Sequence, residues 1–239
     1  MLRSFGNRPP HPVFVDRLAV TPLESITISV DRHNPPYVEE QWGELRGASV
    51  ELVRDAFASQ GVSVRFDPVD GVMAQAIHLA AGHADAAADI TITQRRLRWF
   101  CFSDRYHVED LQLYTRRHGP LWPGWQHFHG RLGVKADSYA HEFLVRHHHL
   151  VPLVPVDSTE RLLEILREER VQGIVLSRIT GATLHEEGAE EIVASGAPFG
   201  PAPLALAALP ERAAVLEIFN AGLAMVGGEA ERLSPFRPH

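Results

Sequence analysis

The sequence lacks several features that define common classes of protein. It contains a single cysteine, Cys101, so no disulfide can form within the chain. No run of about 18 apolar residues occurs, and the sequence therefore predicts no membrane-spanning helix. The formal net charge of −7 argues against nucleic acid or an anionic membrane as the main partner, because both select a basic surface.

Motifs for catalysis and for metal binding are also missing. There is no Gly-x-Ser-x-Gly elbow, no phosphate-binding glycine loop and no dinucleotide fingerprint. Among the 14 histidines, His147, His148 and His149 are adjacent and point to different faces, while His127 and His129 have no cysteine or carboxylate cluster beside them. We therefore expect neither a metal ion nor a cofactor.

The N-terminal residues 1–26 are rich in proline and arginine and lack the apolar segment of a secretory signal peptide. Prolines within residues 1–24 predict an extended arm. Either a signal peptide has been removed or the protein is cytoplasmic, and the sequence leaves both possibilities open.

What the sequence does contain is a regular alternation of strands and helices. Alternating or apolar segments predict strands at 26–30, 62–69 and 86–92, with helices through Val50 and Ile77 between them. This order is typical of a mostly parallel sheet with helices on its faces.

The second half of the chain repeats this alternation of strands and helices. Strands are predicted at 132–134, 150–156 and 173–176, with one helix beginning near Ser138 and another at the capping-box segment Asp157–Glu160. Two such units predict an α/β fold with two lobes and a ligand cleft between them.

Two further apolar segments predict how the lobes are connected. Strands at 112–115 and 203–207 are placed to cross between the lobes, and a helix at 213–225 returns the chain to the first lobe. We expect lobe 1 to comprise residues 1–107 plus 203–239 and lobe 2 residues 108–202, with hinge strands near 107–116 and 198–207. A loop is expected at 33–37, where two prolines interrupt the pattern.

The segment 85–106 holds the clearest candidate for a binding site. An apolar strand ends in Thr91 and Thr93, and Arg96 follows three residues later. A guanidinium is a permanently charged, two-pronged donor for a carboxylate, and a hydroxyl adds a neutral donor. The alternative interpretation is a plain strand end followed by a basic, solvated helical turn.

Several short segments form an ordered set of motifs. They are 31–37, 47–52, 82–85 followed by 91–96, 102–106, and 133–139. In this order they resemble the bacterial extracellular solute-binding proteins of the amino-acid type, which have the two-lobed type II periplasmic binding fold. The resemblance covers roughly residues 25–225.

The resemblance implies a protein without catalytic activity that closes on a small ligand. Arg96 then takes the ligand carboxylate with help from Thr91, and the helix beginning near Ser138 offers backbone N–H groups to the same anion. Asn34 and Tyr37 lie in the segment that resembles the first ligand loop.

Some positions depart from the pattern of the family. Ser177 stands where an aspartate usually takes the ligand's ammonium, and Asn34 stands where an aromatic residue usually stacks on the ligand. Asp89 is a candidate for the missing carboxylate, and Arg178 is a candidate for contacting a second anion. Tyr139 replaces a small residue and either narrows the cleft or packs on its own lobe.

We therefore predict a binding protein for a small carboxylate ligand, an amino acid or a related organic acid, that serves uptake or sensing. The expected partner is a membrane transporter or a receptor, and the protein is expected to be a monomer. The resemblance implies a periplasmic or extracytoplasmic location. Two alternatives stay open: a dehydratase-like enzyme acting on a prephenate-like acid, and a ligand-sensing module of a larger receptor.

Overall fold

The structure, a computed structural model, describes residues 23–147 and 151–230. The expected N-terminal arm, apart from its last two residues, and the adjacent His148 and His149 lie outside the described residues. Among the residues described, no helix combines the length and the apolar composition that crossing a membrane requires.

The first lobe has the strand–helix–strand–helix–strand order that the sequence predicts. Its elements are β1 (Ser25–Asp31), α1 (Ala48–Ser59), β5 (Ser63–Val69), α2 (Gly71–Ala80) and β6 (Ala86–Thr91). β1 pairs in parallel with both β5 and β6. Ile28, Ser29 and Val30 are all fully buried on β1, so both faces of this central strand are covered.

The second lobe repeats this order with shorter elements. They are β9 (Leu132–Lys135), α3 (Tyr139–His147), β10 (Leu153–Val156), α4 (Thr159–Arg167), β11 (Gly173–Ser177) and α5 (Arg178–Glu186). β9 pairs in parallel with β10 and β11. The predicted segment Asp157–Glu160 opens α4, and Ser158 caps this helix by accepting a hydrogen bond from the Arg161 amide at 3.1 Å.

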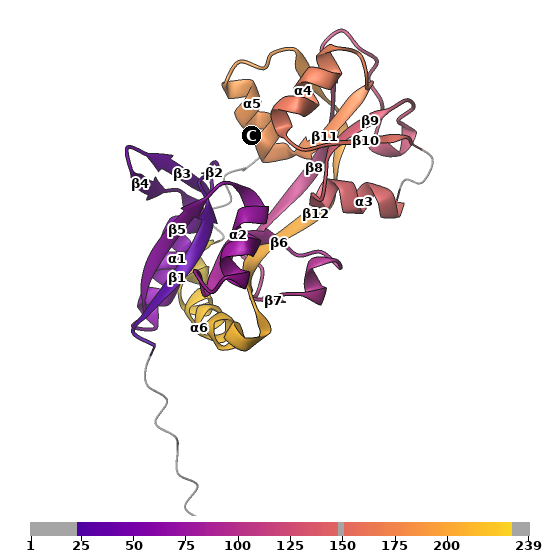
Figure 1. Ribbon diagram of the computed structural model, residues 1–239. Coiled ribbons are helices and arrows are strands. Elements are labelled where there is room, and N and C mark those ends of the chain that lie inside the picture. Colours follow the sequence, from indigo (N-terminus) through magenta and orange to yellow (C-terminus); the bar gives the residue numbers. More distant parts are fainter. Residues whose placement is uncertain (1–22, 148–150, 231–239) are drawn as a thin grey trace, which may run out of the picture.

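Two long antiparallel strands connect the lobes. β8 (His107–Arg116) and β12 (Ile192–Ala208) contain the two crossing segments predicted from the sequence and extend well beyond them. They complete a sheet of order β10-β9-β11-β8-β12-β6-β1-β5, with the short β7 (Cys101–Phe102) also pairing with β12. Figure 1 shows β8 and β12 running from one lobe into the other.

The predicted loop at 33–37 is in part a small sheet. β2 (His33–Asn34), β3 (Val38–Gln41) and β4 (Glu44–Arg46) form a separate antiparallel sheet on the first lobe. The prolines between β2 and β3 hid this pairing from a pattern-based prediction, because each removes a backbone donor. The small sheet places Asn34 and Tyr37 beside the end of β1.

Each lobe has its own apolar core. In the first lobe, α6 (Ala213–Ala230) packs on α1, and the rings of Phe57 and Phe219 lie 5.5 Å apart. In the second lobe, Trp122 and Trp125 pack against the core around Phe128. In Figure 1 the yellow helix α6 lies with the indigo and purple elements of the first lobe.

Candidate functional site

The guanidinium of Arg96 is held over the end of β6. Arg96 opens the short 3-10 helix η1 (Arg96–Arg98), and its backbone N–H donates to the Thr93 hydroxyl at 3.2 Å. Its Nη1 donates to the carbonyl oxygen of Thr91 at 2.9 Å. Within the described residues no carboxylate forms an ion pair with it. A guanidinium has five N–H donors, so most of them remain available to an anion.

The start of α3 faces this arginine from the second lobe. Burial lowers the pKa of Arg96, while the nearby carboxylates of Glu142 and Asp137 raise it. Asp137 has a left-handed backbone (φ 56°) and forms an ion pair with Arg95, so the two lobes touch beside Arg96. Ser138 caps α3, since its hydroxyl accepts a hydrogen bond from the His141 amide at 3.2 Å.

Tyr139 turns toward the strand that connects the lobes. Its hydroxyl donates to the carbonyl oxygen of Pro201 in β12 at 2.8 Å, and its ring packs near Phe143. It also lines a cavity of about 300 Å³ that includes Thr93 and Gln94 from the first lobe. Both readings of Tyr139 therefore describe its position in part: it packs on its own lobe and it borders a space between the lobes.

Asp89 is buried inside the first lobe. Its side chain is 7% exposed, and its Oδ1 accepts hydrogen bonds from the hydroxyls of Ser49 at 2.7 Å and Tyr106 at 3.1 Å. Its Oδ2 is buried and has no hydrogen-bond partner among the described residues. Burial raises the pKa of Asp89 to about 6, and the hydrogen bonds from Ser49 and Tyr106, with the nearby Asn34 side chain, oppose this rise only in part.

Glu109 is the residue that sequence reasoning missed. It lies in β8, and the hydroxyl groups of Ser177 and Tyr37 are near enough to its carboxylate to lower its pKa. Burial raises the pKa of Glu109 to about 7, with a further increase from the charge of Asp89. The expected hinge near 107–116 includes this position, but the strand also carries Asp110, Gln112 and Arg116, so the sequence did not set Glu109 apart.

Other predicted residues are placed around this acidic pair. Tyr37 is 2% exposed, its ring lies 4.6 Å from that of His107, and burial raises the pKa of its hydroxyl. Ser177 caps α5 by accepting a hydrogen bond from the Thr180 amide at 3.0 Å. Arg178 lies 3.8 Å from the carboxylate of Asp110, so part of its charge is offset within the second lobe.

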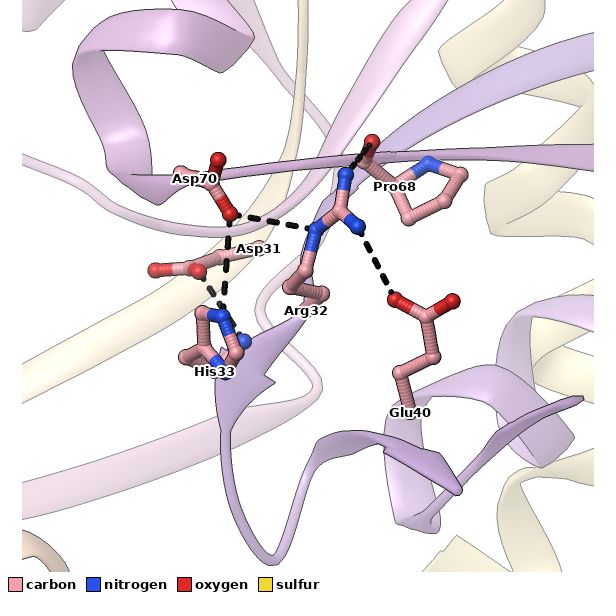
Figure 2. Close-up of polar contacts among 6 residues, drawn as sticks. All are labelled: Asp31, Arg32, His33, Glu40, Pro68 and Asp70. Atoms are coloured by element: carbon pink, nitrogen blue, oxygen red, sulfur yellow. Dashed lines mark hydrogen bonds and ion pairs between the residues drawn. The ribbon is translucent and has the colours of Figure 1, made fainter. Parts of the chain in front are cut away.

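A network of charges fixes the segment that holds Asn34 and Tyr37. Figure 2 shows Arg32 reaching three partners, with Nη1 3.1 Å from Glu40, Nη2 2.8 Å from the carbonyl oxygen of Pro68 and Nε 3.1 Å from Asp70. These partners belong to β3 and to the end of β5. Arg32 therefore ties the small sheet to the main sheet next to the site.

Nothing in the described residues suggests a bound metal ion. No group of three or more His, Cys, Asp or Glu side chains lies close enough together there to hold one. Of the predicted residues, Thr91 holds Arg96 near the start of α3, while Tyr37, Asp89 and Ser177 lie near Glu109.

Solved structures with this fold include a histidine kinase sensor domain and arginine-binding proteins. The sensor domain of a histidine kinase with similarity to periplasmic binding proteins has a TM-score of 0.77 and 22% identity, covering 87% of this chain and 93% of that one. The periplasmic VFT2 domain of Bordetella pertussis BvgS has a TM-score of 0.76 and 18% identity, covering 88% and 94%. An ancestral arginine-binding protein bound to glutamine has a TM-score of 0.73 and 20% identity, covering 88% and 96%.

A comparison with functionally curated proteins finds no match. The solved structures have the same two-lobed architecture, and at these identities they show the fold alone. The sequence itself, over residues 26–228, matches the family of bacterial extracellular solute-binding proteins, family 3. This match spans most of the chain, and the protein therefore belongs to the bacterial extracellular solute-binding proteins of family 3.

Proposed function

We propose that this protein binds a small organic acid between its lobes, an amino acid or a related carboxylate, and that Arg96 takes the carboxylate. The observation that carries the proposal is the position of the Arg96 guanidinium: it is anchored on the Thr91 carbonyl and faces the start of α3. A helix start favours an anion, because its first N–H groups have no partner within the helix.

The binding event serves uptake or sensing, with a membrane transporter or a receptor as the partner. Similar structures include both a histidine kinase sensor domain and an arginine-binding protein, which supports either role. The family consists of binding proteins, so we do not retain the dehydratase alternative. A membrane helix encoded downstream of this segment would favour the receptor.

A thermal-shift screen against amino acids, keto acids and dicarboxylates tests the proposal. A ligand that binds only the folded protein raises the melting temperature. Replacing Arg96 with alanine should weaken binding of any carboxylate found in this way by about 100-fold, because a charged hydrogen-bond partner is lost. Calorimetry measures the affinity.

Arg98→Ala is the matched control, because Arg98 is an exposed arginine of the same short helix. It should bind the same carboxylate as tightly as the parent. Undiminished affinity in Arg96→Ala, or an equal loss in both variants, would show that Arg96 is not the carboxylate site.

A further inference from the structure

The hairpin of β3 and β4 ends in a fully exposed tryptophan. Its two-residue turn consists of Trp42 and Gly43, which both have a positive φ (51° and 80°), as tight turns between antiparallel strands require. Figure 1 shows this hairpin projecting from the first lobe. The Trp42 side chain lies in solvent. One exposed ring is common on protein surfaces, but here an unpaired strand edge and a cavity adjoin it.

The unpaired edge belongs to β4. In the described part of the chain the small sheet has the order β2-β3-β4, so β4 pairs with β3 on one side only. In a hairpin with a two-residue turn, the residues that flank the turn exchange their backbone hydrogen bonds, here Gln41 and Glu44. The backbone N–H and C=O of the next residue, Leu45, therefore point away from β3. Such an edge can pair with a further strand.

A cavity of about 480 Å³ adjoins this edge. Its lining includes all three residues of β4, Arg54 of α1, and Phe66 and Pro68 of β5. The guanidinium of Arg54 lies 5.5 Å from the centre of the Phe66 ring. β5 is itself the last strand of the main sheet. The open space beside β4 therefore gives a second chain room to approach its edge.

The charges on β4 complement those of a second copy of the same strand. Glu44 and Arg46 lie on one face of β4, 2.8 Å apart, with side chains that are 70% and 65% exposed. Antiparallel pairing of two β4 strands about a two-fold axis at Leu45 places Glu44 of each copy opposite Arg46 of the other. An axis at Glu44 or at Arg46 places like charges opposite each other instead. Opposite charges stabilise a cross-strand pair and like charges destabilise it, so one register is favoured.

We propose that two copies of this protein associate through β4, with antiparallel pairing centred on Leu45 that joins their small sheets into one. The contact uses the same surface of both copies, as a two-fold axis requires. The same register sets Trp42 of one copy opposite Ala48 of the other, at the start of α1, so both rings leave the solvent. This association does not depend on the ligand site. It differs from the monomer expected from the sequence, and measurement of the oligomeric state decides between the two.

The proposed contact is small, and its strength follows from its size. Stable dimers bury about 800 Å² on each partner, whereas this contact consists of two three-residue strands and two tryptophan rings. We therefore expect a weak dimer with a dissociation constant of about 10 to 300 μM. Analytical ultracentrifugation from about 5 μM to about 1 mM measures it. A protein that stays monomeric at about 1 mM would overturn the proposal.

Reversing the charges of β4 tests the register. Glu44→Arg sets two arginines opposite each other in both cross-strand pairs, and Arg46→Glu sets two glutamates opposite each other. Each variant alone should raise the dissociation constant at least about 10-fold. A mixture of the two variants should form a heterodimer with about the parent's affinity, because every cross-strand pair again joins opposite charges. Both positions are exposed, so the melting temperature of each variant should stay close to that of the parent.

Two further variants separate this contact from other causes of association. Trp42→Asn keeps a turn sequence that tolerates positive φ and removes the ring, and should raise the dissociation constant about 10-fold or more. Glu187→Arg, at an exposed position of the second lobe, makes the same change in net charge as Glu44→Arg and should dimerise like the parent.

The failing outcomes are distinct from one another. If the parent dimerises and both charge-reversal variants dimerise equally well, the contact lies elsewhere on the molecule. If each variant is weakened and their mixture is not restored, the register centred on Leu45 is wrong. An equal loss in Glu187→Arg would assign the effect to net charge, and a Trp42→Asn variant that dimerises like the parent would place the turn outside the contact.

Discussion

Asp89 is held in a conformation and in surroundings that both act against its charge. Its φ of 58° lies in the left-handed region, within β6, where the register with β12 shifts between Ala205 and Ala207. Such irregularities turn a side chain out of the strand's regular alternation. Here the carboxylate is turned into the buried space beside Ser49 and Tyr106. An aspartate in this place costs stability when it is ionised.

Replacing Asp89 with asparagine should make the protein less sensitive to pH. The pKa of Asp89 is raised from 3.8 to about 6, so the folded state binds the proton more tightly than the unfolded chain. The stabilisation is complete below about pH 4 and is lost as the pH rises through about 6. Between about pH 4 and pH 8, the free energy of unfolding of Asp89→Asn should gain about 1 to 3 kcal/mol relative to the parent.

Urea unfolding at the two pH values measures this difference. Any pH-independent effect of the new amide group cancels in the comparison. Asp55→Asn, on the exposed face of α1, should show no such gain. If the difference in unfolding free energy between variant and parent stays constant with pH, Asp89 is not protonated in the folded protein.

At the scale of single residues, the sequence identifies Arg96 as a candidate but does not identify Glu109. The spacing of Thr91 and Arg96 after an apolar strand is local, and this local pattern is visible in one segment. Glu109 acquires its raised pKa from burial, near residues such as Tyr37 and Ser177 that are distant from it in the sequence. A burial-driven pKa shift has no local sequence signal.

At the scale of elements, the contact between α1 and α6 depends on a glycine. A Cβ atom at Gly222 of α6 would lie 2.0 Å from the carbonyl oxygen of Ala56 in α1. The two helices therefore approach closely enough for backbone to touch backbone. This contact holds the C-terminal helix on the first lobe.

Gly222→Ala should destabilise the protein by about 2 to 3 kcal/mol, because the helices must move apart. The sign of the change in stability is informative, because replacing a glycine inside a helix with alanine otherwise stabilises a protein by about 1 kcal/mol. Thermal and urea unfolding give the value. Ala224→Ser, at an exposed position of the same helix, should change stability by less than about 0.5 kcal/mol. A stabilised Gly222→Ala would mean that α6 does not approach α1 this closely.

The predicted strands and helices differ from the observed ones where long-range pairing decides. The two α/β units follow from alternation and helical periodicity, which are local. The small sheet of β2, β3 and β4 escaped prediction, because its stability comes partly from Arg32 binding Glu40 and Asp70 across elements. The full length of β12 was also not predicted, because prolines and glycines interrupt its apolar pattern.

At the scale of the whole molecule, we propose that β8 and β12 are the hinge between lobe 1 (residues 1–107 plus 203–239) and lobe 2 (residues 108–202). Both strands contribute to the sheet in each lobe. The ion pair between Arg95 and Asp137 then joins lobe 1 to lobe 2. Its strength sets how easily the lobes separate.

Breaking this ion pair should shift the protein toward the open form. The two side chains are 67% and 59% exposed, so the pair contributes at most about 1 kcal/mol and is screened by salt. Arg95→Ala should weaken ligand binding by up to about 5-fold at low ionic strength, with a larger radius of gyration in small-angle X-ray scattering. The difference should disappear in about 0.5 M salt.

Asp137→Asn distinguishes two roles of Arg95. In one, its ion pair with Asp137 acts as a latch that holds the lobes together. In the other, Arg95 only attracts an anionic ligand. Asparagine tolerates the left-handed backbone at this position (φ 56°) and removes the charge. If Arg95 only attracted the ligand, removing Asp137 would raise affinity for a carboxylate. If the pair is a latch, both single variants lower the affinity and the double variant lowers it no further. Arg98→Ala should leave the affinity and the radius of gyration unchanged, so a shift in that variant would assign the effect to net charge instead of the latch.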